Sequence, residues 1–290
     1  MPHTLSLRPA VAAACLLTAC AAATGTAHAQ PIAATLVYVA LGDSFSAGVG
    51  LDPQAPTPGG LPSVCGRSMV DYPRLVAAAL GAAEFRDVSC GGATTANLTG
   101  PQPDISEPVP PQFDALTTDT TLVTIGIGGN DIGLEQLAGS CLAPLPSCSA
   151  AAAGAGDPVG QRIEGFAPVY GTVVEQVRAH SPRARIVLVG YPTGVRAGGC
   201  PDTQPMRSAD ADYLEAKVEQ LDYVMAAQAA AHGATYVDLL PSTRGHDACA
   251  DPAGTWITGV YPGPGAPIPL HPNAAGHRNA ARQILATLGD

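Results

Sequence analysis

The sequence predicts an α/β fold, a three-layer α/β/α sandwich with a central parallel sheet. Residues 36–41 and 121–127 are apolar runs that end in glycine turns. Runs of this kind are typical of strands that are buried on both faces. Expected strands and helices alternate along the chain, which indicates a parallel sheet with helices packed against it.

Shorter patterns supply the other elements in order. Further strands are expected at residues 85–88, 185–189 and 234–239. Helices are expected where apolar side chains recur at helical spacing, at residues 72–80, 159–180, 208–232 and 273–288. The segments between them are rich in proline, glycine or alanine. Since neither a repeat nor a linker divides the chain, residues 30–290 are expected to form one domain.

Residues 1–29 have the features of a secretory signal peptide. Arg8 precedes an apolar run over residues 10–23, and an A-x-A site ends at Ala29. The run is shorter than the roughly 20 residues that span a bilayer. An alternative is a lipoprotein signal, because residues 17–20 resemble the box in which a cysteine, here Cys20, is lipidated. A secreted protein is expected in the first case and an anchored one in the second.

Charge restricts the class of partner. The chain has 290 residues, with 14 Lys and Arg against 24 Asp and Glu. Removal of residues 1–29 takes away Arg8 and no acid, which leaves 13 against 24 and a net charge of −11. Such a surface argues against binding to nucleic acid or, by charge alone, to anionic membranes. We expect a monomer without an obligate protein partner.

Six cysteines remain after the export segment, an even number that favours three disulfides in an exported protein. Two of them lie seven residues apart around two prolines and are expected to close a small loop. The predicted pairs are Cys141–Cys148, Cys65–Cys90 and Cys200–Cys249. Zinc ligation is the alternative, but the chain lacks a C-x-x-C motif or a nearby Cys/His set.

Four polar motifs follow expected strands or lie on loops near the same sheet edge. They contain Ser44 in GDS, Gly92 in CGGAT, Asn130 in GGND and His271 in HPNAAGH. Open α/β sheets bind ligands at the carboxyl ends of their strands. Each residue also has a simpler interpretation: Ser44, Asn130 and His271 could cap helices, and Gly92 could serve only a turn.

In this order and spacing, the four motifs resemble the SGNH (or GDSL) hydrolase family over the whole mature chain. The resemblance is closest to exported actinobacterial esterases and lipases, which carry three disulfides and a stretch like residues 245–249. It implies the flavodoxin-like SGNH fold and a serine carboxylic ester hydrolase without a cofactor or a metal. Ser44 would form the acyl-enzyme with His271 as base. The oxyanion hole would use the Ser44 and Gly92 N–H groups and the Asn130 amide.

The chain departs from the family pattern at one position. The family often has Asp three residues before the histidine, and here that residue is Ile268. We predict a Ser44–His271 dyad in which the carbonyl of Pro269 or Ile268 accepts the Nδ1 proton. The alternative is that Asp247 or Asp251 reaches the imidazole from the preceding loop. A carbonyl can fix the tautomer, although it stabilises imidazolium less than a carboxylate does.

Substrate choice is less determined than the reaction. The residues expected to line an acyl groove are Leu51, Leu61, Val260 and Tyr261, which favours acyl esters and lipids. A carbohydrate acetylesterase is the alternative, ranked second because the chain is poor in aromatic residues. A binding protein with a dead site is a third hypothesis. Of the other histidines, His246 is interpreted as shaping its loop and His277 as a surface group.

Overall fold

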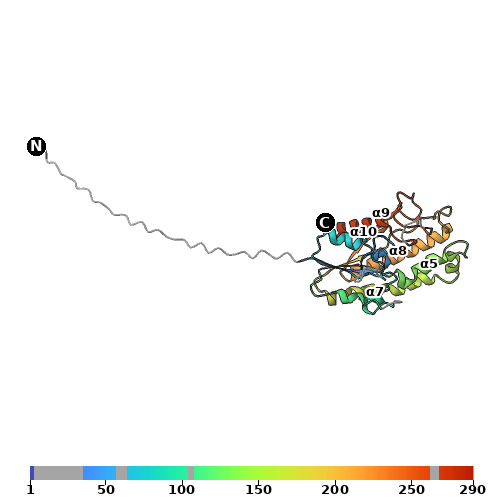
Figure 1. The fold of residues 1–290 in the computed structure, drawn as a ribbon, viewed down its shortest axis with the longest axis horizontal. Coiled ribbons are helices and arrows are strands. Elements are labelled where there is room, and N and C mark those ends of the chain that lie inside the picture. Colours follow the sequence, from blue (N-terminus) through green and yellow to red (C-terminus); the bar gives the residue numbers. More distant parts are fainter. Residues whose placement is uncertain (3–34, 57–63, 104–107, 262–267, 290) are drawn as a thin grey trace. The chain divides into compact units, whose positions relative to one another are not determined.

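A parallel sheet forms the centre of the computed structural model, which describes residues 1–2, 35–56, 64–103, 108–261 and 268–289 (Figure 1). The strands are β1 (Val37–Gly42), β2 (Glu84–Asp87), β3 (Leu122–Gly126), β4 (Arg185–Val189) and β5 (Thr235–Val237). Their order in the sheet is β2-β1-β3-β4-β5, and every neighbouring pair is parallel. The predicted fold class is confirmed.

The two strands at the centre are buried along their whole length, as their apolar runs predict. All residues of β1 and β3 are buried. Because side chains alternate along a strand, Val39 and Leu41 pack into the core on one face of the sheet. Tyr38 and Ala40 pack into the core on the other face.

Two pairs of long helices cover the sheet. The helices α7 (Pro158–His180) and α8 (Ser208–Ala231) pack on the face that carries Val39. The opposite face is covered by α2 (Tyr72–Ala79) and α10 (Ala274–Leu288). Figure 1 shows α7 and α10 on opposite sides of the sheet. All four helices lie within a few residues of the expected ranges.

Several short elements have no counterpart in the sequence patterns, because one or two turns are too short for a periodic apolar face. An example is α6, which forms in an alanine-rich stretch for which no helix is predicted, where the Ser147 side chain caps it by accepting the Ala150 N–H. These elements are α1 (Ser44–Ala47), α3 (Ala96–Thr99), η1 (Gln112–Ala115), α4 (Gly129–Ile132), α5 (Leu134–Ser140), α6 (Cys148–Gly154) and α9 (Leu240–Thr243).

Three disulfides join the predicted cysteine pairs, Cys65–Cys90, Cys141–Cys148 and Cys200–Cys249. The prediction of this pairing is confirmed. Since each of the six sulfur atoms is bonded to another sulfur, the zinc alternative is wrong. The disulfide Cys141–Cys148 also contributes to a small apolar cluster with Met206 and Leu214.

The described residues from 35 to 289 belong to one compact unit. The expected signal peptide, its boundary before Gln30 and Cys20 lie outside the described residues, so those predictions stay predictions. Within the described ranges, every helix is too short or too polar to cross a bilayer.

An ion triad ties α2 to the end of β2. The Arg74 guanidinium contacts the carboxylates of Asp71 and Asp87, whose side chains are buried. Asp71 also caps α2 by accepting the Arg74 N–H at 2.8 Å. Burial raises the pKa of Asp71 to about 8, with a further increase from Asp87, while Arg74 opposes both effects. One cation therefore compensates two desolvated acids.

Substitution Arg74→Met should lower the free energy of unfolding by about 3–5 kcal/mol at pH 7, because it leaves buried charge without a partner. The loss should deepen as pH rises through about 8, because Asp71 of the wild type ionises there beside Arg74, whereas the variant lacks that cation and has a still higher pKa for Asp71. Urea unfolding at several pH values measures both effects.

The matched control is Arg183→Met, which removes an ion pair with Asp119 whose side chains are 61% and 80% exposed. Exposed pairs contribute about 1 kcal/mol or less. Equal losses in the two variants would contradict the role assigned to the triad.

Candidate active site

The turn after β1 presents Ser44 as the first residue of α1. Gly42 has a φ of +151°, and a Cβ there would lie 2.5 Å from a carbonyl oxygen of β3, so glycine is required. Asp43 caps α1 by accepting the Phe45 N–H at 2.9 Å. The interpretation of Ser44 as a mere helix cap is therefore wrong, and its hydroxyl is available for another partner.

The hydroxyl of Ser44 lies against the imidazole of His271, with 2.7 Å between Oγ and Nε2. On the other side of the ring, Nδ1 is 2.9 Å from the carbonyl oxygen of Pro269. A carbonyl oxygen only accepts hydrogen bonds, so Nδ1 carries the proton and Nε2 is the acceptor. This tautomer is the one that can take a proton from a serine.

The backbone before His271 turns sharply to bring the imidazole back to Pro269. Leu270 has a φ of +57°, a left-handed conformation that costs a bulky residue about 1–3 kcal/mol. Two hydrogen bonds of 2.9 Å hold the turn: Leu270 N–H donates to the Thr258 carbonyl, and Thr258 N–H donates to the His271 carbonyl. The conformation is thus imposed by the neighbouring loop.

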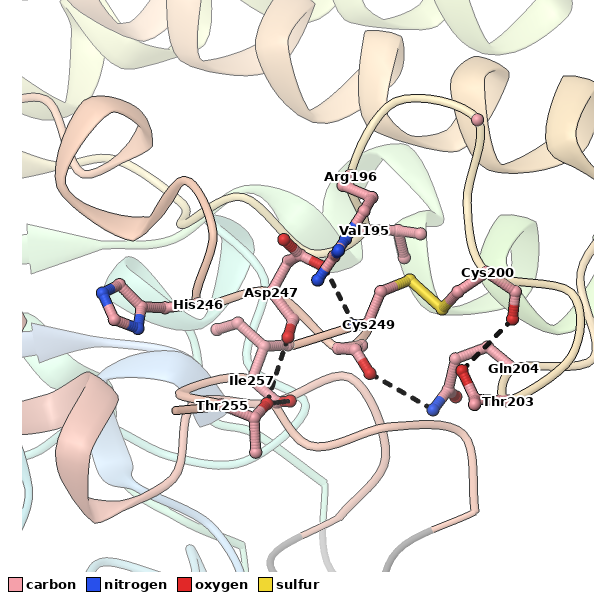
Figure 2. A network of polar contacts seen from close by, with 12 residues as sticks. Val195, Arg196, Cys200, Thr203, Gln204, His246, Asp247, Cys249, Thr255 and Ile257 are labelled. Carbon is pink, nitrogen blue, oxygen red and sulfur yellow. Dashed lines mark hydrogen bonds and ion pairs between the residues drawn. A yellow bond between two sulfur atoms is a disulfide. The ribbon is translucent and has the colours of Figure 1, made fainter. Parts of the chain in front are cut away.

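Of the two candidate carboxylates, Asp247 has other contacts (Figure 2). Asp247 is buried, and its Oδ1 accepts the Cys249 N–H at 2.9 Å and Arg196 Nε–H at 3.1 Å. Asp251 is exposed. Among the described residues, neither carboxylate has a hydrogen bond to His271. Of the two predicted carbonyl acceptors, Pro269 is the one within hydrogen-bonding distance.

His246 lies on the same loop but has the contacts of a residue that shapes it. Its ring stacks on Trp256 with centroids 3.6 Å apart and planes inclined by 4°. Its Nδ1 is 2.6 Å from the Gly254 carbonyl oxygen. Figure 2 shows this ring pointing away from the disulfide Cys200–Cys249. The loop role expected from the sequence agrees with these contacts.

Three candidate hydrogen-bond donors come from residues that line the same cleft: Ser44, Gly92 and Asn130. The backbone N–H groups of Ser44 and Gly92 have no acceptor among the described residues. Asn130 Nδ2 donates one hydrogen to the Ala93 carbonyl at 2.9 Å, which leaves its second hydrogen available. Gly92 has a φ of +73°, a conformation that favours glycine. The arrangement can bind a negatively charged oxygen next to the serine.

Hydrogen bonds tie the loops that carry these donors to one another. Asp131 accepts the Thr95 hydroxyl at 2.6 Å and the Thr95 N–H at 3.1 Å, which connects the GGND turn to the CGGAT loop. The first turn is held by Asp43, whose Oδ2 accepts the Tyr191 hydroxyl at 2.6 Å. Burial raises the pKa of Asp43 to about 7, and the hydrogen bonds from Tyr191 and Phe45 oppose that rise.

A cleft of about 770 Å³ contains the four residues predicted from the motifs: Ser44, Gly92, Asn130 and His271 all line it. Much of its wall is apolar and includes Leu134, Leu142, Val195, Leu214, Val218 and Val260. The structure thus brings together residues that are up to 227 positions apart in the chain.

The predicted lining of the cleft is only partly correct. Val260 lines it, but Leu51 is buried elsewhere and Tyr261 is 72% exposed outside the lining. Leu61 lies outside the described residues. The apolar side chains that the prediction missed include Val49 after α1, Leu134 in α5, Leu142 just beyond α5, and Val195. Only Leu214 and Val218, on the expected helix 208–232, had a periodic signal, and that signal indicates burial rather than cleft lining.

A second histidine lies beneath the nucleophile turn, which corrects the expectation of a surface group. His277 is 1% exposed, and its Nδ1 accepts the Tyr72 N–H at 3.1 Å. Burial lowers its pKa to about 3. The missed signal is the apolar face of α10, since His277 is three, four and seven residues before Ala280, Ala281 and Ile284.

Burial also lowers the pKa of His271 from 6.5, although the hydrogen bond to Pro269 opposes this.

The part of the chain that the structure describes contains no group of three or more His, Cys, Asp or Glu residues able to hold a metal ion. The candidate site itself combines one hydroxyl, one imidazole and three hydrogen-bond donors, carried by residues that line a largely apolar cleft. Such a set can activate a serine and stabilise an oxyanion.

Comparison with known proteins agrees with this arrangement. A model of the GDSL-like Lipase/Acylhydrolase family matches residues 40–278. Lipase 2 of Streptomyces coelicolor is 38% identical over 282 residues, covering 91% of this chain and 90% of that protein. The crystal structure of an extracellular lipase from Streptomyces rimosus has 27% identity and a TM-score of 0.73, and covers 87% of this chain and 99% of that one.

A second solved structure, phospholipase A1 from Streptomyces albidoflavus NA297, has 28% identity and a TM-score of 0.70 and covers 88% of this chain and 100% of that one. The family match includes Ser44, Gly92, Asn130 and His271. Because both the family model and Lipase 2 extend over most of its length, this chain belongs to the GDSL-like lipase/acylhydrolase family.

Proposed function

We propose that the protein hydrolyses carboxylic esters with Ser44 as nucleophile and His271 as general base. The observation that carries the proposal is the 2.7 Å contact between Ser44 Oγ and His271 Nε2, on a ring whose other nitrogen is bonded to Pro269. A serine hydroxyl needs such a base to attack a carbonyl near neutral pH.

The proposed reaction uses these groups in turn. Nε2 of His271 takes the hydroxyl proton while Ser44 Oγ bonds to the ester carbonyl carbon, whose oxygen becomes an oxyanion. The N–H groups of Ser44 and Gly92 and the Asn130 amide donate hydrogen bonds to that oxygen. Collapse breaks the bond to the alcohol, which leaves with the proton from His271. A water molecule, deprotonated by His271, then attacks the acyl-enzyme; the bond to Ser44 Oγ breaks, His271 returns the proton to that oxygen, and the acid is released.

The substrate class that we propose is acyl esters, including lipids. The apolar side chains of Leu134, Leu142 and Val218 line the cleft that contains Ser44 and suit an acyl chain. Relatives named as lipases and a phospholipase A1 support this choice. Carbohydrate acetyl esters rank second, because the aromatic side chains in the lining, Phe45 and Tyr191, are packed on each other.

We also propose that the protein works outside the cytoplasm as a secreted monomer. Support comes from the expected signal peptide over residues 1–29, from the three disulfides and from the extracellular lipase among its relatives. Lipidation of Cys20 is the alternative. The intact mass of protein from its native host tests it, since a chain that begins at Gln30 lacks Cys20.

Substitution Ser44→Ala should abolish hydrolysis of p-nitrophenyl esters, with kcat reduced by about 10⁶-fold. Esters from acetate to palmitate should show a preference for longer acyl chains. A preference for acetate would favour the carbohydrate esterase instead. A folded wild type that hydrolyses none of these esters and is not labelled at Ser44 by a fluorophosphonate would support a binding protein.

The acidic limb of the kcat/KM profile should have its midpoint below 6.5, because burial lowers the pKa of His271 and the base must be neutral to accept a proton. Activity should therefore persist at mildly acidic pH. Glu135→Gln should move the limb to lower pH, since the Glu135 carboxylate raises the pKa of His271. A midpoint above 6.5 in the wild type would contradict the neutral base.

Substitution Asp247→Asn should leave kcat within about tenfold of the wild type, because the Pro269 carbonyl and not a carboxylate orients the imidazole. A true triad aspartate costs about 10⁴-fold when it is changed to Asn. Asp251→Asn is the matched control on the same loop. A loss near 10⁴-fold in either variant would replace the dyad with a triad.

A further inference from the structure

The hydroxyl of Tyr191 lies between the two turns that carry the candidate oxyanion donors. It donates to Asp43 Oδ2 at 2.6 Å in the turn after β1, and it accepts the Gly129 N–H at 2.7 Å in the turn after β3. Tyr191 is 3% exposed, so both hydrogen bonds are shielded from water. One oxygen atom therefore joins the two turns.

On the first side, the Tyr191 hydroxyl fixes how Asp43 caps the nucleophile helix. Each carboxylate oxygen of Asp43 has its own partner, Oδ1 the Phe45 N–H and Oδ2 the Tyr191 hydroxyl. With both oxygens held, the carboxylate has one orientation. The cap leaves the Ser44 N–H without an acceptor among the described residues, and Ser44 lines the cleft.

On the second side, the phenol packs directly on the backbone that precedes Asn130. A Cβ at Gly129 would lie 3.0 Å from the Tyr191 oxygen and 3.2 Å from the ring carbon that bears it. A side chain at that position would push the two apart. The contact thus fixes the position of the GGND turn relative to Tyr191, and with it the position of the Asn130 amide.

The ring of Tyr191 also supports the base. It packs edge-on against Phe45 with centroids 5.0 Å apart, and Phe45 packs against the imidazole of His271 at 4.4 Å. The Tyr191 backbone is itself anchored, since its N–H donates to the buried Asp222 carboxylate at 2.9 Å. Tyr191 therefore contacts the turns that carry Ser44 and Asn130, and it supports His271 through Phe45.

We propose that Tyr191 is a positioning residue that sets the distance between the Ser44 N–H and the Asn130 amide. It is not an oxyanion donor, because its single O–H is committed to Asp43. The inference rests on the proposed ester hydrolase function. Errors of about 1 Å in such sites can cost about 10²-fold in rate, so a bridge of this kind has a measurable effect.

The test is Tyr191→Phe, which keeps the ring packed on Phe45 and removes both hydrogen bonds. We expect kcat to fall by about 10- to 100-fold, which is at most the lower end of the roughly 10²- to 10³-fold loss caused by removing one oxyanion donor. KM should change by less than about twofold. The matched control is Tyr38→Phe. It also removes a buried tyrosine hydroxyl, here bonded to Thr124 Oγ1 at 2.7 Å within the sheet, and kcat should stay within about twofold.

A second measurement separates positioning from general loosening of the fold. In an Asn130→Ala background the Asn130 amide is already absent, so Tyr191→Phe can no longer displace it. The fold-loss of kcat caused by Tyr191→Phe should then be at least about fivefold smaller than in the wild type. An unchanged cost in the two backgrounds would overturn the proposal. So would a Tyr191→Phe variant whose kcat falls no more than that of Tyr38→Phe.

Asp43→Asn replaces Tyr191→Phe if the latter does not fold. The amide keeps an oxygen for the Phe45 N–H but gives the Tyr191 O–H no acceptor, so the same loss of kcat is expected, and a variant that retains full kcat would overturn the proposal.

The wild type is the reference for both hypotheses. If it hydrolyses no ester, the proposed function fails. If the wild type is active and Ser44→Ala is not, the proposed function stands. Variants Tyr191→Phe or Asp43→Asn that keep full kcat would then overturn only the proposal for Tyr191.

Discussion

Burial of β1 and β3 on both faces is the constraint on which the rest of the structure depends. These strands lie side by side at the centre of the sheet, in the order β2-β1-β3-β4-β5. Their carboxyl ends adjoin at the point where the chain reverses its direction of winding, and loops there diverge to opposite faces. Ser44 follows one strand and Asn130 follows the other, so the core that holds the strands together also brings these residues together.

The sequence predicted those parts of the fold and site that have a periodic or local signal. The strands, the four long helices, the disulfide pairs and the approach of Ser44 to His271 agree with the structure. The resemblance supplied the four site residues, because each lies in a short motif next to a strand end or a helix start. Pro269 was one of two carbonyls left open, and the distance to Nδ1 distinguishes them.

What the sequence did not predict depends on packing between distant segments. Tyr191 follows a strand in an ordinary G-Y-P turn, and its importance arises only from the positions of Asp43 and Gly129, 148 and 62 residues away. The burial of His277 arises from its place on the apolar face of α10, beside Ala280, Ala281 and Ile284, and not from any motif around it. The wall supplied by α5 was missed because that helix is too short to show a period.

Among the residues that the structure describes, His271 has the Pro269 carbonyl and no carboxylate as its Nδ1 partner, and this links the site to the loops around it. When imidazolium forms, the Pro269 carbonyl offers a dipole where a triad offers a full negative charge, and the site is partly desolvated. The negative charge nearest to imidazolium in the transition state is then the oxyanion itself. Stabilisation of the ion pair depends on how well the oxyanion is held, since electrostatic effects are strong in a water-poor site. A dyad of this kind therefore places greater demands on its oxyanion donors than a triad does, and a buried hydroxyl that holds two donor turns at a fixed distance meets that demand.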